Sequence, residues 1–257
     1  MTNLKLSVVI PAYNEEENIK KKAPDQVIDY LKKQDYSWEL LFVDDGSKDK
    51  TADLLEKYSK KDKRIYTIRN LHQGKAGTVV TGVLKGKGDI ILFTDMDQAT
   101  PINQIEKFFP FFDISLPAGR QGYDIVIGSR RGRRGAPFIR RLMAQVFVVL
   151  RTMFLRLPFS DTQAGFKAFT RDAAQDVFRN LIIFGKQNII NQPAVKAGFD
   201  LEFLYVARKR GHKIKEVPVD WDYKGSKRVS AIRDGLDSVK DILKIRWYSL
   251  RGAYREN

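Results

Sequence analysis

The sequence predicts an α/β fold in which helices flank a mostly parallel β-sheet. Short apolar runs, typical of strands buried on both faces, alternate along the first half of the chain with segments of helical periodicity. Polar clusters follow four of these runs, and parallel sheets bind ligands at the carboxyl ends of their strands. The 257 residues, 43% of them hydrophobic, are enough for one large domain. We therefore predict a single domain over residues 1–257, with one polar cleft at a sheet edge.

Apolar runs and boundary residues place the individual elements. Pro24 interrupts or restarts the first helix, Asp49 caps the second, and Pro101 begins another, since these residue types are frequent at helix starts. Gly74 and Gly77 form a turn that leads into a helix ending at residue 84. In chain order, strands are predicted at residues 4–10, 39–43, 65–68, 90–95, 124–128 and 213–221, and the other helices at 16–33, 51–60, 101–110, 138–157, 200–210 and 229–251.

The fourth strand ends in Asp95-Met96-Asp97-Gln98, the stretch around which the predicted site is organised. Residues i and i+2 of an extended chain point to the same side, so both carboxylates face one spot at the end of the strand. Two carboxylates held together repel unless a positive charge lies between them. A hard divalent cation, Mg²⁺ or Mn²⁺, takes oxygen ligands and leaves positions open for substrate phosphates. The alternative is that the two acids cap the next helix.

Composition excludes several classes of site. The chain has no cysteine and two histidines, which rules out disulfides and thiol nucleophiles and makes a multi-histidine metal site improbable. A net charge of +15, from 46 basic and 31 acidic residues, favours an anionic partner such as nucleic acid, a nucleotide or a membrane surface. We recognise no signal peptide and no run of the ~20 apolar residues that a membrane span needs, so we expect a cytosolic protein. His72 and His212 read as solvated loop residues without a role.

The character of the sequence changes after about Pro137. Residues 138–157 are strongly apolar yet contain four arginines, a pattern that suits an amphipathic helix at a membrane surface. An ordinary core helix with a solvated face is the alternative. The predicted helix at 229–251 also combines apolar residues at helical spacing with interleaved basic residues. The four arginines of the first segment are Arg140, Arg141, Arg151 and Arg156.

Three motifs at the ends of successive strands resemble those of the family-2 glycosyltransferases, which have the Rossmann-like GT-A fold. They are VVIPAYNE at residues 8–15, VDDGSKD at 43–49 and DMD at 95–97. Within that family, the segments at 128–130, 161–167, 199–202, 217–221 and 225–227 look like those of polyprenyl-phosphate sugar transferases, with dolichyl-phosphate glucosyltransferases nearest and mannosyltransferases next. The resemblance covers roughly residues 6–254. Two features depart from it: we find neither the N-terminal anchor of the eukaryotic glucosyltransferases nor the Q-x-x-R-W motif of processive polysaccharide synthases.

The resemblance implies a donor half at residues 1–130 that binds a UDP- or GDP-hexose, with UDP-glucose favoured. Pro11 and Tyr13 are either pocket residues or simple turn residues, and Asp45 only braces its loop. Lys75 is either a phosphate ligand at a helix start or a solvated lysine. The resemblance assigns the nucleotide sugar to Pro11, Tyr13, Glu15, Asp44, Lys75 and Asp95, and a Mg²⁺ or Mn²⁺ cofactor to Asp95, Asp97 and Gln98.

The same resemblance implies a polyprenyl or dolichyl monophosphate as acceptor, bound by a membrane-facing half at residues 131–257. A phosphate monoester has its second pKa at about 6, so it needs positioning more than a general base. Asp200 lies where relatives that act on hydroxyls keep a base; here it either orients a cation or caps its helix, and Asp161 is a cap or an acceptor-site residue. The acceptor phosphate is assigned to Arg130, Arg140, Lys167, Arg228 and Ser230, and catalysis, with inversion, to Asp97, Arg130 and Asp200.

Because the acceptor's tail stays in the bilayer, we expect a peripheral protein on the cytoplasmic face of a membrane, docked on anionic lipid by its basic amphipathic helices. Two other functions stay open. A glycosyltransferase of the same fold that acts on a polysaccharide or protein hydroxyl is disfavoured by residues 161–167 and by the missing motif. A nucleic-acid-binding protein is permitted by charge alone, but acidic clusters at the strand ends repel a phosphate backbone, so we expect no nucleic-acid partner.

Overall fold

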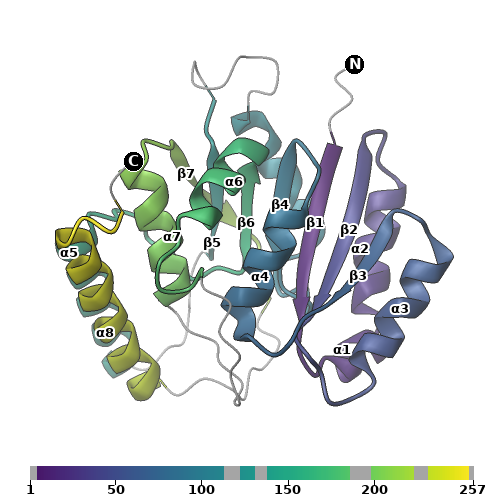
Figure 1. The fold of residues 1–257 in the computed structure, drawn as a ribbon, viewed down its shortest axis with the longest axis horizontal. Coiled ribbons are helices and arrows are strands. Elements are labelled where there is room, and N and C mark those ends of the chain that lie inside the picture. The colour runs from purple at the N-terminus through teal and green to yellow at the C-terminus, as the bar shows by residue number, and fades with distance from the viewer. Residues whose placement is uncertain (1–4, 113–121, 131–137, 186–197, 223–230, 255–257) are drawn as a thin grey trace.

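The computed structural model describes residues 5–112, 122–130, 138–185, 198–222 and 231–254, apart from the side chains of 138–144, 146 and 231–236. Within these residues the strands form one seven-stranded sheet in the order β3-β2-β1-β4-β6-β5-β7 (Figure 1). Neighbouring strands are parallel except where they pair with β6. The strands are β1 (Lys5–Ala12), β2 (Ser37–Asp44), β3 (Ile65–Arg69), β4 (Ile90–Thr94), β5 (Ile125–Arg130), β6 (Phe166–Thr170) and β7 (Ile214–Val219).

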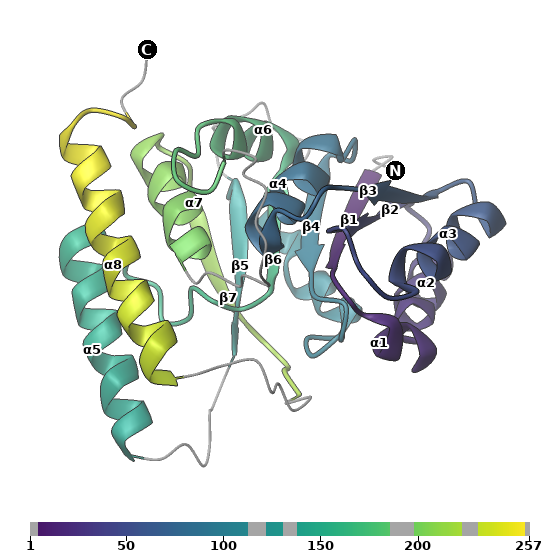
Figure 2. The same ribbon diagram turned by 60° about the horizontal axis from the view of Figure 1, so that its bottom comes forward.

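Helices cover both faces of the sheet and bury an apolar core on each side, which confirms the predicted fold class. On one face lie α4 (Gly74–Lys85), α6 (Arg171–Arg179), α7 (Gly198–Lys209) and α8 (Ala231–Leu250). On the other lie α1 (Glu16–Lys20), α2 (Ala23–Lys32), α3 (Thr51–Lys61) and the 3₁₀ helix η1 (Ile102–Lys107), followed by η2 (Phe109–Phe111). The long helix α5 (Phe138–Leu155) runs beside α8 at the outer edge of the molecule (Figure 2).

The strand order changes direction between β1 and β4, and this switch determines where a ligand fits. From β1 the chain builds outward through β2 and β3, whereas β4 lies on the other side of β1. The carboxyl ends of β1, β2, β4 and β5 therefore meet at one edge, beside the switch point at which α/β sheets bind ligands. Because β6 is antiparallel, its first residues lie at this same edge. The segment before β6 is thus brought to the ends of the parallel strands.

Most of the predicted elements are present, with differences that have local causes. The predicted break near Pro24 is confirmed: Lys22 has a left-handed φ of 62° between α1 and α2. The predicted turn at Gly74 is instead the first residue of α4. The helix expected from Pro101 is two short 3₁₀ helices, and the second contains Pro110, which has no N–H to donate.

Two elements, β6 and α6, were absent from the predicted set. Lys167 is the second of the five residues of β6, so this buried strand lacks the continuous apolar run of strands such as β4. Helix α6 begins with a side-chain cap, because Thr170 Oγ1 accepts a hydrogen bond of 3.3 Å from the Ala173 N–H. Among the described residues, no helix has the length and apolar composition that crossing a membrane requires.

Candidate active site

The loops after β1 and β2 are joined into one structure by Asn14. This residue has a left-handed φ of 53°, a conformation that asparagine tolerates better than most residues. Its N–H donates to Ser47 Oγ at 2.9 Å, and its Oδ1 accepts from the Lys48 N–H at 2.9 Å. Pro11, next to the last residue of β1, lies opposite Val43 of β2. The first two predicted motifs are therefore a single unit at the sheet edge.

Asp44 ends β2 inside this unit and keeps one oxygen available. Its side chain is buried, and Oδ2 accepts a hydrogen bond of 3.2 Å from the Ser47 N–H. Its Oδ1 is also buried and has no hydrogen-bond partner among the described residues. A buried acceptor without a partner is costly unless a ligand satisfies it. Asp44 therefore has the properties of an acceptor for a hydroxyl or N–H of a bound ligand.

Asp45 and His72 hold an aromatic ring at the same edge. The Asp45 carboxylate accepts hydrogen bonds of 2.8 Å from the N–H groups of Gln73 and Gly74 and binds His72 Nδ1 at 2.7 Å. The imidazole stacks on the Tyr13 ring, with centroids 4.2 Å apart. The expectation that His72 is a solvated loop residue is wrong, because this carboxylate and this ring enclose it. The backbone N–H groups of Gln73 and Gly74, at the start of α4, donate to Asp45. They are therefore not available to bind a phosphate, contrary to what we had expected of this helix start.

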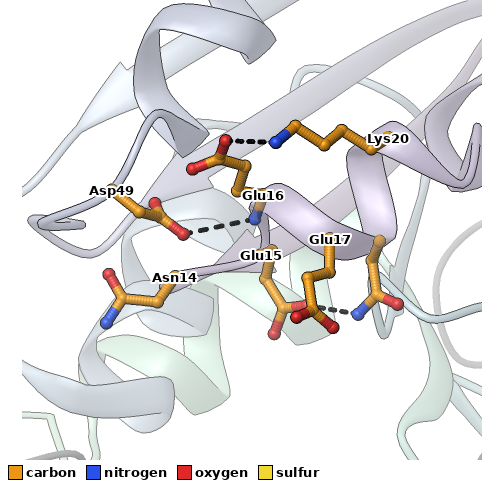
Figure 3. Close-up of a pocket in the computed structure, with 7 residues that line it drawn as sticks. Asn14, Glu15, Glu16, Glu17, Lys20 and Asp49 are labelled. Atoms are coloured by element: carbon orange, nitrogen blue, oxygen red, sulfur yellow. Dashed lines mark hydrogen bonds and ion pairs between the residues drawn. The ribbon is translucent and has the colours of Figure 1, made fainter.

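Beside these loops lies an open hollow at the start of α1 (Figure 3). It is lined by four acidic side chains, two asparagines and one lysine, and the lysine is paired with Glu16 at 2.6 Å. The Glu15 carboxylate lies in the hollow and accepts a hydrogen bond from Asn18. An acidic lining repels a diphosphate, so this hollow is not the place for one. The lining residues are Asn14, Glu15, Glu16, Glu17, Asn18, Lys20 and Asp49.

Directly after β4, the two predicted metal ligands lie on one side of the chain. The chain here is a turn, closed by a hydrogen bond of 3.3 Å from the Gln98 N–H to the Asp95 carbonyl, and not the extended strand that the i, i+2 argument assumed. Asp95 and Asp97 are partly exposed, and Met96 between them is buried. Asp97 Oδ1 accepts from the Ala99 N–H at 3.0 Å. Gln98 has a left-handed φ of 49°; its amide Nε2 donates to the Asp95 carbonyl at 2.8 Å, and its Oε1 is buried without a partner among the described residues. The turn thus offers only oxygen donors.

This donor set fits a hard cation that shares its coordination with a substrate. No group of three or more His, Cys, Asp or Glu side chains suited to a metal ion occurs in the described part of the chain. Two carboxylates can bind Mg²⁺ or Mn²⁺ when substrate phosphates and water complete the shell, which is the usual arrangement for Mg²⁺. The residues present therefore fit a cation that binds together with a diphosphate.

Lys75, the second residue of α4, reaches across to this turn. Its Nζ donates to Asp95 Oδ1 at 2.6 Å and lies 5.5 Å from the centre of the Phe93 ring. Burial acts to lower the pKa of the ammonium, but the charge and hydrogen bond of Asp95 outweigh burial. The carboxylates of Asp200 and Asp97 act in the same direction, so the pKa of Lys75 is raised. Lys75 is a charged partner of the site rather than a solvated surface lysine.

Gly165, just before β6, packs against Asp95 Oδ2, the carboxylate oxygen that Lys75 does not bind. A Cβ atom built on this glycine would lie 1.9 Å from Asp95 Oδ2 and 2.5 Å from its Cγ. Real Cβ atoms do not approach other atoms so closely, so only glycine fits while the carboxylate keeps its position. The segment before β6 therefore packs its backbone directly against the acid that ends β4.

Lys167 and Asp200 form the first ion pair on the acceptor side. The Lys167 side chain is fully buried in β6, and its Nζ donates to Asp200 Oδ1 at 2.7 Å and to the Ala164 carbonyl. The rings of Phe93 and Phe203 lie 5.7 and 5.6 Å from the ammonium. Asp200, in the first turn of α7, thus orients Lys167, which is one of the two roles left open for it.

Arg130 and Asp161 form the second ion pair. The guanidinium grips the carboxylate with Nε–Oδ2 at 2.6 Å and Nη2–Oδ1 at 2.8 Å, and the Arg130 N–H donates to the same carboxylate at 3.1 Å. Glu216 of β7 accepts from the Asp161 N–H at 2.8 Å. Burial acts to lower the pKa of Arg130, but its bond to Asp161 and the charges of Asp200 and Asp95 raise it. Arg130 therefore stays charged. The carboxylates of Asp95 and Asp200 interact electrostatically with Arg130 and with Lys75 alike.

Comparison with known proteins identifies the family to which a chain with this site belongs. The model of glycosyl transferase family 2 matches residues 7–178, and the dolichyl-phosphate β-glucosyltransferase of Homo sapiens is 34% identical over 265 residues, covering 97% of this chain and 77% of that protein. The chain belongs to glycosyl transferase family 2. The corresponding proteins of Saccharomyces cerevisiae and Trichomonas vaginalis are each 32% identical, covering 98% and 97% of this chain and 77% and 75% of theirs. This family member is a glycosyltransferase.

Solved structures support the GT-A fold of this glycosyltransferase. The mannosyl-3-phosphoglycerate synthase of Rubrobacter xylanophilus matches with a TM-score of 0.68 at 18% identity, covering 98% of this chain and 76% of that one. The glucosyl-3-phosphoglycerate synthase of Mycobacterium tuberculosis, in complex with Mn²⁺, UDP and glucosyl-3-phosphoglycerate, matches with a TM-score of 0.59 at 20% identity, covering 97% and 80%.

Some predicted residues of this glycosyltransferase lie outside the cluster just described. Arg228 and Ser230 are outside the described residues, and Arg140 is in α5 but its side chain is not described. His212 is not solvated as expected: its Nε2 binds the Asp176 carboxylate at 2.8 Å. Sequence reasoning missed Gly165 as a site residue, although a glycine between two acceptor-side motif positions is a signal of close backbone approach.

Proposed function

We propose that this glycosyltransferase transfers glucose from UDP-glucose to a dolichyl or other polyprenyl monophosphate, with inversion at the anomeric carbon. The observation that carries the proposal is geometric: donor-side Lys75 donates to Asp95 Oδ1 at 2.6 Å, Gly165 of the segment before β6 packs against the same carboxylate, and the charges of Asp95 and Asp200 reach both Lys75 and Arg130. Donor and acceptor cations therefore converge on one acidic centre. The names of the relatives favour glucose and dolichyl phosphate.

On the donor side, the base and ribose would lie against Tyr13, which His72 holds by stacking. Asp44 Oδ1 is the free acceptor for a ribose or base donor, and Pro11 and Glu15 border the same loop. The diphosphate would lie between Lys75 and the turn after β4. Asp95 and Asp97, with Gln98 in the same turn, would hold a divalent cation, which supplies charge neutralisation for the departing nucleoside diphosphate.

On the acceptor side, a phosphate oxygen would attack the anomeric carbon while the bond from that carbon to the UDP oxygen breaks. UDP leaves as an anion, and the α-linked donor becomes a β-linked glucosyl phosphate. No general base is needed, because the phosphate is already ionised near pH 7. Of the two predicted acceptor cations whose side chains are described, Arg130 is the one that a phosphate can approach, since its side chain is 16% exposed. Lys167 is fully buried and paired with Asp200, so we do not assign it to direct contact with the acceptor.

A transfer assay with labelled donors tests the reaction. We expect UDP-glucose with dolichyl phosphate and Mn²⁺ or Mg²⁺ to give a product that partitions into organic solvent and releases glucose in mild acid, and EDTA to abolish it. GDP-mannose in a parallel reaction tests the base and the sugar together. Label that stays in a water-soluble polymer would instead identify a hydroxyl acceptor and overturn the lipid-phosphate proposal.

The outer face of the α5 and α8 pair is the surface we propose for contact with anionic lipid. Exposed apolar side chains follow helical spacing on both helices, and exposed basic side chains of α8 adjoin them. Two parallel stripes suit a helix pair that lies in the plane of the membrane interface. Arg151 does not belong to this surface, because it is buried and donates to Thr162 Oγ1 at 3.1 Å. The stripe residues are Val149, Met153, Leu243, Trp247 and Leu250.

Vesicle binding tests this surface. We expect the chain to sediment with anionic vesicles at low salt, and the double variant Trp247→Glu, Leu250→Glu to bind about tenfold more weakly, because it loses apolar burial and adds negative charge. Leu71→Glu is the control for the Leu250→Glu change, since Leu71 is as exposed as Leu250 but lies outside the helix pair. Equal binding of the double variant and the control would exclude this face.

Gly165→Ala tests the close packing at Asp95. The added methyl group pushes the carboxylate out of position, and a misplacement of about 1 Å in a catalytic site can cost on the order of a hundredfold in rate. We expect transfer to fall by about that factor while the melting temperature changes little, because the displaced group is the end of a side chain. A normal rate would show that Asp95 does not need this position.

A further inference from the structure

Asp95 is already neutralised by a cation that belongs to the protein. Lys75 Nζ lies 2.6 Å from Asp95 Oδ1, and the two side chains are 32% and 36% exposed. A carboxylate that is to receive a divalent cation is more commonly left open or held by N–H donors. Here the oxygen that would bind the metal is occupied by an ammonium group.

The other oxygen of Asp95 gives a cation no easier route. Asp95 Oδ2 packs against Gly165 on one side, since a Cβ on that residue would lie 1.9 Å away, although the carboxylate as a whole is 36% exposed. A divalent ion that binds Asp95 therefore either displaces Lys75 from Oδ1 or binds at Oδ2 as a like charge beside the ammonium. Both are unfavourable while nothing else in the site attracts the ammonium.

A nucleoside diphosphate changes this balance because it attracts the ammonium. Lys75 stands on the first turn of α4 and has a flexible four-carbon stem, so its ammonium can turn from Asp95 to a phosphate that enters the same space. The phosphate also supplies the oxygens that complete the shell of the metal. Release of Asp95 by Lys75 and capture of the metal then occur together.

We propose that Lys75 is an exchange cation, which blocks Asp95 when the donor is absent and passes to the donor diphosphate when metal and donor bind. The inference rests on the proposed function and goes beyond it. It requires that the metal alone binds weakly and that metal and nucleotide strengthen each other's binding by the same factor. An enzyme of this kind holds no tightly bound metal between turnovers.

Metal titration tests the exchange. Mn²⁺ binding is measured by the electron paramagnetic resonance signal of the free ion, with and without UDP, for the wild type and for Lys75→Met, which keeps the stem but removes the charge. In the wild type we expect UDP to tighten Mn²⁺ binding at least about tenfold, within the usual range of coupling between sites. In Lys75→Met we expect Mn²⁺ alone to bind about tenfold more tightly than in the wild type, and the effect of UDP to shrink accordingly.

Two further variants make the result specific. Lys75→Arg keeps a cation at the position and should bind Mn²⁺ alone as weakly as the wild type. Lys107→Met removes a lysine that pairs with Asp220 at 3.2 Å outside the site, and it should leave Mn²⁺ binding unchanged. Melting temperatures of all variants confirm that they are folded.

The outcomes separate the two proposals. If the wild type binds Mn²⁺ with UDP but Lys75→Met binds Mn²⁺ alone no more tightly than the wild type, the exchange is overturned and the proposed function stands. If the wild type binds no Mn²⁺ even with UDP, the metal role in the proposed function fails, and the exchange fails with it.

Discussion

Asp97→Asn is expected to abolish metal-dependent sugar transfer while leaving the protein folded. The asparagine Oδ1 can still accept the Ala99 N–H, so the turn after β4 keeps its hydrogen bond. The negative charge is lost, however, and with it half of the carboxylate pair that would bind the cation. Metal neutralisation of the leaving group is worth several kcal/mol, and about 1.4 kcal/mol corresponds to a factor of ten, so we expect a loss of about a thousandfold in kcat.

The measurement is the rate of labelled glucose transfer at saturating Mn²⁺, together with the melting temperature. Asp53→Asn is the control, because Asp53 is an exposed acid that pairs with Arg69 at 3.1 Å outside the site. The control should transfer at the normal rate. Near-normal transfer by Asp97→Asn would remove Asp97 from the metal site; the alternative that the two acids cap the next helix is already wrong, because Pro101 is the N-cap of η1 and no side chain caps it.

Glu202→Ala is expected to destabilise the protein by on the order of 4 kcal/mol, the largest stability effect we anticipate from a single substitution. Glu202 of α7 is fully buried, and its carboxylate accepts hydrogen bonds from the N–H groups of Ile182, Ile183 and Phe184 at 2.7–2.8 Å. The Tyr254 hydroxyl donates to the same carboxylate at 2.7 Å. Removing the acceptor leaves these four donors unsatisfied, two of them on buried residues and two on partly buried ones.

Thermal unfolding measures the effect. For a chain of this length, the expected loss corresponds to a fall in Tm of about 8–16 °C. Tyr254→Phe removes one of the four donors and should cost only about 1 kcal/mol. Burial and the nearby Glu202 carboxylate raise the pKa of the Tyr254 hydroxyl, so it stays protonated and able to donate. A Glu202→Ala variant as stable as the control Glu17→Ala, at an exposed position, would contradict this role.

Strands β1, β2, β4 and β5 were predictable because each contains an apolar run that ends in a polar cluster. β6 was not, because Lys167 interrupts it, and the partner that permits its burial, Asp200, is 33 residues away in the chain. A buried lysine in a strand makes sense only once the fold brings its counter-ion into contact. Local sequence patterns do not contain that information.

The residues of the candidate site also fall into two groups, those that the local sequence predicts and those that only the tertiary structure brings to the site. Asp95 and Asp97 were placed at the sheet edge because an apolar strand ends just before them, although they lie in a turn and not in the extended chain that we had expected. The partners of these residues could not be placed in this way, since Lys75, Gly165 and His72 reach the site from other elements by tertiary contact. Ion pairs also explain why two predictions from the sequence differ from the structure. Lys75 could have been a solvated surface residue and His72 was expected to be one, but Lys75 pairs with Asp95 and His72 with Asp45.

The antiparallel strand β6 also has a consequence for how the chain is made. β4 and β5 each hydrogen-bond to β6, which lies between them. While the protein is being synthesised, a nascent chain that ends before residue 166 therefore leaves the β6-facing edges of β4 and β5 open, the kind of surface that recruits strands from other molecules. The same late strand brings Gly165 to Asp95. Protection from aggregation and the assembly of a working catalytic centre thus depend on one step of translation.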